Sequence, residues 1–180
     1  MAVSDSQCSR VSGIAAGVGR ELGWSGPVLA LLRMAALLQD VGKISIPDRI
    51  LRKGEELSEE DLEELKRHPI EGADLVGRVE GLDPILPWIR HSHEHFDGSG
   101  YPAGLAGESI PMASRILLVA KAYVAMTSER PYREARSSHQ AMEELSECVG
   151  VQFDPACVAA LKRHLRHQEE HRETAEPVVA

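Results

Sequence analysis

Apolar residues recur at helical spacing along almost the whole chain, and this periodicity limits the fold more than any other feature. The pattern is clearest over residues 11–18, 28–38 and 116–126. Spacing of three or four residues gives each helix one apolar face, whereas the alternation that indicates strands is nearly absent. Since 43% of the residues are hydrophobic and only 4% aromatic, the sequence predicts an all-α fold packed through Leu, Ala, Val and Ile.

Prolines and capping residues indicate where these helices begin. Three prolines suit first helical turns: Pro27, Pro84 and Pro155. The last two follow acidic residues that could cap a helix: Asp83 and Asp154. Two pairs have the spacing of a capping box: Ser58 with Asp61, and Ser137 with Gln140. We expect a single bundle of about seven helices over residues 1–167, followed by a disordered tail over 168–180.

Two long segments rich in Gly, Pro and Asp interrupt the helical pattern, at residues 41–57 and 96–111. Loops of this length in a small helical domain usually serve a site. We therefore expect the two loops to meet in space over a shallow pocket.

Charge and cysteine content exclude several classes of function. The formal net charge of −8 argues against binding to nucleic acid polymers or anionic membranes, although a local basic pocket could hold one phosphorylated ligand. No apolar run reaches the roughly 20 residues that span a bilayer. The three cysteines form no CxxC pair, which predicts reduced thiols in a cytoplasmic protein.

Six short motifs follow one another in a recognisable order. They are Leu38-Gln39-Asp40-Val41-Gly42-Lys43-Ile44, Ile46-Pro47-Asp48, Lys66-Arg67-His68-Pro69, His93-Glu94 with Asp97-Gly98-Ser99-Gly100-Tyr101-Pro102, Thr127-Ser128-Glu129-Arg130-Pro131-Tyr132-Arg133, and Phe153-Asp154-Pro155. This order and spacing resemble the HD-GYP family, the HD-type metal-dependent phosphohydrolases that cleave cyclic dinucleotides such as cyclic di-GMP. The resemblance covers roughly residues 6–165.

The resemblance implies an all-helical HD-type domain in which iron or manganese ions activate a hydroxide. Such ions need bridging carboxylates and surrounding imidazoles. It assigns Asp40, His68 and His93 to the metal, and Asp40 and Lys43 to catalysis. These roles are vestigial if no metal binds.

Several positions depart from the family pattern. Four of them replace expected metal-site residues: Gln39, Ser92, Lys121 and Val124. In addition, Cys8 stands where the family has an early histidine. Lys121 matters most, because it replaces a bridging anion with a cation that repels a nearby dication by about 2 to 8 kcal/mol. We therefore expect no cofactor; if one binds, it is a divalent iron or manganese ion.

Lys121 suggests a specific hypothesis about the site. Its ammonium group would replace the metal electrostatically and form an ion pair with Asp40. The alternative is that Lys121 lies on a shifted helix face and extends to solvent.

Groups that could bind a phosphorylated ligand are retained better than the metal ligands. By resemblance, they are Lys43, Gly98, Gly100, Tyr101, Arg130 and Arg133. Each also has a structural interpretation: Lys43 could interact with a helix dipole, the arginines could be surface charges, and Tyr101 could pack the loop. Asp97 reads as a turn residue. Of His91, His93 and His95, only His93 is assigned a site role, and a displaced ligand that compensates for Ser92 is an alternative interpretation of His91.

We expect a domain of cyclic-dinucleotide signalling that is metal-deficient and non-hydrolytic. It would act by binding cyclic di-GMP, or a protein partner through the GYP loop, which we define as residues 96–111. Two alternatives stay open: an active metal-dependent phosphodiesterase with a reduced metal site, and a purely structural dimerisation module. Whether the chain is an enzyme, and whether it forms a homodimer, is left open by the sequence.

Overall fold

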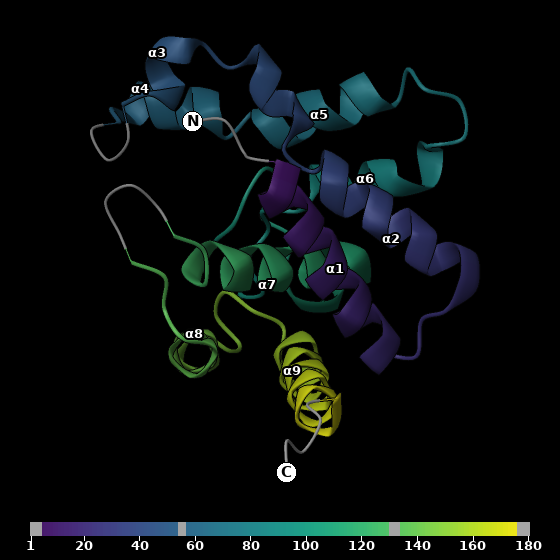
Figure 1. Cartoon of the computed structure of the whole chain (residues 1–180). Helices are drawn as coiled ribbons and strands as arrows, with labels where there is room; N and C mark the ends of the chain where they lie inside the picture. Colours follow the sequence, from purple (N-terminus) through teal and green to yellow (C-terminus); the bar gives the residue numbers. More distant parts are fainter. Residues whose placement is uncertain (1–4, 54–56, 130–133, 176–180) are drawn as a thin grey trace.

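The structure, a computed structural model, describes residues 5–53, 57–129 and 134–175, and these residues form an all-helical bundle (Figure 1). The α-helices are α1 (Asp5–Glu21), α2 (Gly26–Leu38), α3 (Asp48–Leu51), α4 (Glu59–Leu65), α5 (His68–Val76), α6 (Leu86–Arg90), α7 (Met112–Met126), α8 (Ser138–Glu147) and α9 (Pro155–Ala175). Three 3-10 helices lie between them: η1 (Val41–Ser45), η2 (Asp83–Ile85) and η3 (Gly107–Ser109). Within the described ranges there are nine α-helices where about seven were predicted, and two of the nine, α3 and α6, have only four and five residues.

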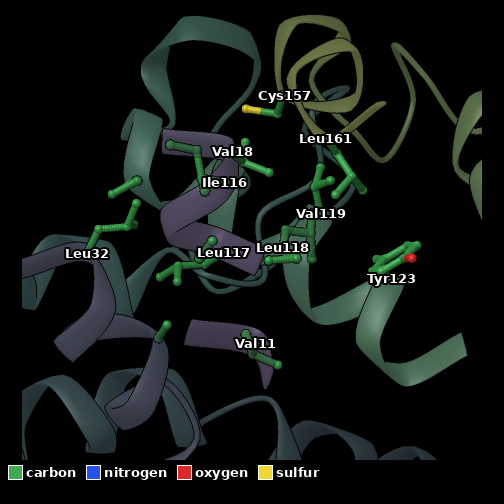
Figure 2. Packing of buried hydrophobic residues seen from close by; sticks show 14 of the residues in the cluster. Val11, Val18, Leu32, Ile116, Leu117, Leu118, Val119, Tyr123, Cys157 and Leu161 are labelled. Carbon is green, nitrogen blue, oxygen red and sulfur yellow. The ribbon is translucent and has the colours of Figure 1, made fainter. Parts of the chain in front are cut away.

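The core is built around α1 and α7, which pack against each other and against α9. Figure 1 shows α1 crossing α7, with α2 beside α1 and α9 at the opposite end from α3 and α4. Figure 2 shows how the apolar faces meet, with Val18, Ile116 and Leu161 contributed by three different helices. All three side chains are completely buried. The packing is aliphatic, as the low aromatic content predicts.

Both predicted capping boxes are present. Ser58 Oγ accepts a hydrogen bond from the Asp61 backbone N–H at 3.2 Å. Ser137 Oγ accepts from the Gln140 N–H at 3.2 Å, and Gln140 Oε1 accepts from the Ser137 N–H at 2.9 Å. These residues fix the first turns of α4 and α8.

The two predicted aspartate caps have different outcomes. Asp154 caps α9, because its Oδ1 accepts from the Ala156 N–H at 2.6 Å. Asp83 is not a cap: it lies inside η2, whose preceding residue is Leu82. The chain makes a tight 3-10 turn there before α6 begins, so Pro84 starts a short turn and not a long helix.

The capping box of α8 gives a stability prediction. Replacing Ser137 with alanine removes the acceptor for the Gln140 N–H and should lower the free energy of unfolding by about 1 kcal/mol. For a chain of this size, that corresponds to a midpoint lower by about 2 to 4 °C in thermal denaturation followed by circular dichroism. Ser146→Ala is the control, because Ser146 lies in the same helix and, within the described residues, its hydroxyl donates only to the Met142 carbonyl oxygen. An equal loss in both variants would contradict the capping role.

The loop predicted over residues 41–57 is partly helical. It contains η1 and α3, which leave shorter connections on either side. The sequence prediction missed them because Gly42 and Pro47 break the apolar pattern, whereas both residues are compatible with tight turns and first helical positions. The GYP loop is mostly irregular, as predicted, and includes η3 near its end.

The chain end continues as helix beyond the predicted domain limit. Helix α9 runs to Ala175, and residues 176–180 lie outside the described part. The boundary at 167 and the disordered tail stay predictions. In the part of the chain that the structure describes, every helix is too short or too polar to cross a bilayer.

Candidate functional site

Three donor side chains from separate parts of the chain converge on one point. Asp40 lies between α2 and η1, His68 opens α5, and His93 follows α6. One ligand atom from each lies within 4.8 Å of the others. The structure therefore brings together the three residues that the sequence assigned to a metal, and we call them the triad.

The two histidine rings are held so that their Nε2 atoms face the triad centre. His68 Nδ1 lies 2.7 Å from the Leu65 carbonyl oxygen and donates to it, which leaves Nε2 directed at Asp40 Oδ1, 3.5 Å away. His93 Nδ1 lies 2.9 Å from the Tyr101 hydroxyl. The two Nε2 atoms are 3.2 Å apart. Fixing one ring nitrogen with a hydrogen bond so that the other points inward is how proteins orient metal-binding histidines.

Lys121 of α7 reaches into this arrangement. Its Nζ donates to Asp40 Oδ1 at 2.9 Å and to His93 Nε2 at 3.0 Å. The predicted ion pair with Asp40 is thus present, and the lysine does not extend to solvent from a shifted face. Because the ammonium donates to His93 Nε2, that nitrogen is an acceptor, and Nδ1 carries the proton that is donated to Tyr101.

Lys43 binds the same carboxylate oxygen as Lys121. Its Nζ lies 2.9 Å from Asp40 Oδ1, and its side chain is 31% exposed. Lys43 therefore lies at the outer edge of the triad. Two ammonium groups share one carboxylate, so the cluster carries an excess of positive charge in a chain of net charge −8.

These contacts shift the ionisation of the buried groups. Burial alone raises the pKa of Asp40, but attraction to Lys121 and to Lys43 outweighs it and holds that pKa well below its usual value. Burial and the charge of Lys121 lower the pKa of His93, so its ring is neutral. Burial lowers the pKa of Lys121, while Asp40 opposes that shift. Burial also raises the pKa of Tyr101, which keeps its hydroxyl protonated.

Glu94 anchors the GYP loop beside the triad, and the sequence analysis assigned it no such role. Its side chain is fully buried. Oε1 accepts from the Ala103 N–H at 2.8 Å, and Oε2 accepts from the Leu105 N–H at 3.2 Å. The sequence signal that could have indicated this role is an acidic residue two positions before a loop rich in glycine and proline. A buried carboxylate here organises the loop that carries Tyr101.

The loop glycines have packing roles. A Cβ at Gly100 would lie 2.2 Å from His95 N and 2.6 Å from Glu94 Cα, so only glycine allows this close approach. Gly98 adopts a φ of 88°, which favours glycine. Asp97 is a turn residue as predicted, with Oδ1 accepting from the Ser99 N–H at 2.9 Å. Whether either glycine contacts a ligand stays a prediction.

Three of the four substituted positions, Gln39, Ser92 and Val124, contribute no donor atom to the triad. Ser92 is fully buried and donates to the Ile89 carbonyl at 2.8 Å, and Val124 is part of the apolar core. Gln39 is buried and donates to the Ala36 carbonyl at 3.2 Å. His91 Nδ1 lies 3.2 Å from Glu94 Oε1, so it supports the loop anchor and does not compensate for Ser92. Cys8 interacts electrostatically with Lys121 and opposes the lowering of that lysine's pKa.

Two candidate ligand contacts cannot be placed. Arg130 and Arg133 lie outside the described residues. Their assignment to phosphate binding stays a prediction.

The donor atoms of the triad suit one metal ion, but the neighbouring Lys121 ammonium group does not. A carboxylate and two inward-facing imidazoles would suit a borderline dication at about 2.0–2.2 Å. Any ion bound at that distance to Asp40 Oδ1 would lie within about 5 Å of Lys121 Nζ, since Nζ is 2.9 Å from that oxygen. At effective dielectric constants between those of water and a protein surface, the repulsion is about 2 to 7 kcal/mol. With Lys121 charged and in place, the site does not fit a divalent ion.

Comparisons with known proteins match these features to one family. Residues 2–157 match the family described as HD domain. The chain is 42% identical over 158 residues to the cyclic di-GMP phosphodiesterase response regulator RpfG of Xanthomonas campestris, an alignment that covers 86% of this chain and 41% of that protein.

Solved structures share the fold. The cyclic GMP-AMP-specific phosphodiesterase V-cGAP3 of V. cholerae superimposes with a TM-score of 0.75 at 23% identity, over 94% of this chain and 46% of that one. The protein Bd1817 of Bdellovibrio bacteriovorus, titled an HDG"Y"P protein, gives a TM-score of 0.69 at 25% identity, over 89% of this chain and 51% of that one. The chain thus spans about half of these proteins or less.

These comparisons support some of the expectations from sequence and not others. The all-helical HD-type fold and the predicted family are confirmed. The names of the relatives support the phosphodiesterase alternative and give no support to a non-hydrolytic domain.

Proposed function

This chain belongs to the HD domain family and is of the HD-GYP type, and from this premise we propose that it recognises a cyclic dinucleotide at the triad. Cyclic di-GMP is the first candidate ligand, because a relative that is 42% identical is named for that nucleotide. Cyclic GMP-AMP is the second, since a protein of the same fold is named for it. The domain would serve cyclic-dinucleotide signalling.

The observation that carries the proposal is the excess positive charge at a partly exposed point. Lys43 and Lys121 both contact Asp40 Oδ1, and their side chains are 31% and 24% exposed. An ammonium group already held in place at a partly exposed position can turn to a phosphate with little further loss of conformational freedom. Tyr101 adds an aromatic face next to His93, with ring centroids 4.9 Å apart. Together they offer contacts for a phosphate and a base.

Hydrolysis is the second candidate function. The names of the relatives favour it, and the triad provides three donor atoms of the right kind. The charge of Lys121 opposes it, because the family's activity depends on metal. The binding and hydrolytic forms of the proposal therefore differ in one measurable respect, the turnover of bound nucleotide.

Calorimetric titration tests recognition directly. The chain should bind cyclic di-GMP with a saturable isotherm, and Lys43→Ala should weaken the affinity by about 10-fold or more, since a hydrogen bond to a charged group contributes about 1.5–3 kcal/mol. Lys162→Ala is the control, because Lys162 is an exposed lysine on α9. Absence of saturable binding for both cyclic di-GMP and cyclic GMP-AMP would refute the proposal, as would equal losses in the two lysine variants.

Chromatography of the same samples separates the two functions. Incubation with Mn²⁺ or Fe²⁺ and cyclic dinucleotide would release a linear dinucleotide if water is added across a phosphodiester bond. Product that accumulates over many turnovers supports the hydrolytic form. Binding with unchanged nucleotide supports the binding form. A protein partner at the GYP loop and a homodimer stay separate predictions.

A further inference from the structure

The Lys121 ammonium contacts two of the three donor atoms that could hold a metal ion. It lies 2.9 Å from Asp40 Oδ1 and 3.0 Å from His93 Nε2. The third donor, His68 Nε2, is 3.2 Å from His93 Nε2. Acceptor atoms this close repel one another unless a proton or a cation lies among them. Lys121 supplies that positive charge from within the chain.

The donor arrangement itself does not depend on Lys121. The His68 ring is fixed by the Leu65 carbonyl, and the His93 ring by the Tyr101 hydroxyl. Asp40 keeps a second partner, because Lys43 also binds its Oδ1 at 2.9 Å. Removing the Lys121 charge would therefore leave three oriented donors in place.

We propose that Asp40, His68 and His93 form a latent site for one divalent metal ion. The Lys121 ammonium group keeps metal ions out of this site. Loss of the lysine charge by a single substitution opens the site to Zn²⁺ or Mn²⁺. The inference concerns metal binding alone and holds whether or not a cyclic dinucleotide binds.

The two lysines on Asp40 provide a matched pair of variants. Lys121 contacts Asp40 and His93, whereas Lys43 contacts only Asp40 among the described residues and lies at the edge. Methionine has a similar length and an unbranched shape but no charge. Lys121→Met should create the metal site, while Lys43→Met should change metal affinity far less.

The experiment is a calorimetric titration of metal-free protein with Zn²⁺, repeated with Mn²⁺, and checked by elemental analysis after dialysis. We expect no stoichiometric metal in the natural chain, and one ion per chain in Lys121→Met with affinity for Zn²⁺ at least about 100-fold higher, because a nearby like charge has been removed. Adding His68→Ala to Lys121→Met should abolish the gain. Lys43→Met should raise the affinity by less than about 10-fold, since within the described residues the Lys43 ammonium is paired with Asp40 alone at the edge of the site, whereas that of Lys121 also contacts His93 Nε2.

Several results would overturn the inference. One is tight binding of one Zn²⁺ by the natural chain, with the ion lost in His68→Ala; this titration needs no folded Lys121 variant. Weaker binding in Lys121→Met than in the natural chain would mean that the lysine amine is itself a ligand. Equal gains in Lys121→Met and Lys43→Met would show that general charge, and not the position of Lys121, decides the affinity.

Discussion

Alanine at position 42 is expected to lower the free energy of unfolding by about 3 kcal/mol, the upper end for inserting a methyl group into a closely packed place. A Cβ at Gly42 would lie 1.9 Å from the His68 carbonyl oxygen and 2.5 Å from Gly72 N. Both are backbone atoms, so no side-chain rotation relieves the overlap. The contact holds η1 against α5 and thereby keeps Asp40 beside His68.

Thermal and urea denaturation would measure this loss, which corresponds to a midpoint lower by about 6 to 12 °C for a chain of this size. Gly13→Ala is the matched control, because a Cβ at Gly13 meets nothing within 4 Å. Since Gly13 lies inside α1, alanine there should be neutral or stabilising by up to about 1 kcal/mol. A Gly42→Ala protein as stable as Gly13→Ala would show that η1 moves away from α5 without cost.

Alanine at position 94 is expected to release the GYP loop and to lower the free energy of unfolding by about 2 to 4 kcal/mol. The fully buried Glu94 carboxylate accepts from the Ala103 and Leu105 N–H groups and from His91. Removing it leaves two partly buried N–H donors without this partner, and each lost hydrogen bond to a charged group costs about 1.5–3 kcal/mol. The Tyr101 hydroxyl would then no longer be held at His93 Nδ1.

Hydrogen exchange followed by mass spectrometry would localise this effect. In Glu94→Ala, peptides containing Ala103 and Leu105 should exchange faster, while peptides from α7 should change only with global stability. Glu108→Ala is the control, because Glu108 is an exposed acidic residue of the same loop. Unchanged exchange in the loop of Glu94→Ala would contradict its role as an anchor.

The local features of this fold could be predicted from sequence because they depend on near neighbours. The capping boxes at Ser58 and Ser137 involve residues three positions apart, and both are present. Helical periodicity likewise reports which side of a segment is apolar. Asp83 shows the limit: an acidic residue before proline suits the start of several kinds of turn, and here the turn is a 3-10 helix.

The charged residues of the site could also be predicted from sequence, since the sign of each side chain's charge follows from its residue type. Replacement of an expected anion by Lys121 was sufficient to predict its ion pair with Asp40, which the structure contains. That Lys121 takes the place of a metal stays a proposal. The sequence could not reveal that Lys43 shares the same oxygen or that His91 turns to Glu94.

The sequence by itself determined the helical class, the capped starts of α4, α8 and α9, and the residue types available for chemistry, because each depends on local spacing or on side-chain identity. Only the tertiary structure decided which nitrogen of His68 and His93 faces inward, and that Lys121 reaches both Asp40 and His93. Those contacts join residues far apart in the chain. Their distances depend on how α7, α5 and η1 pack against one another. No local sequence pattern predicts that packing.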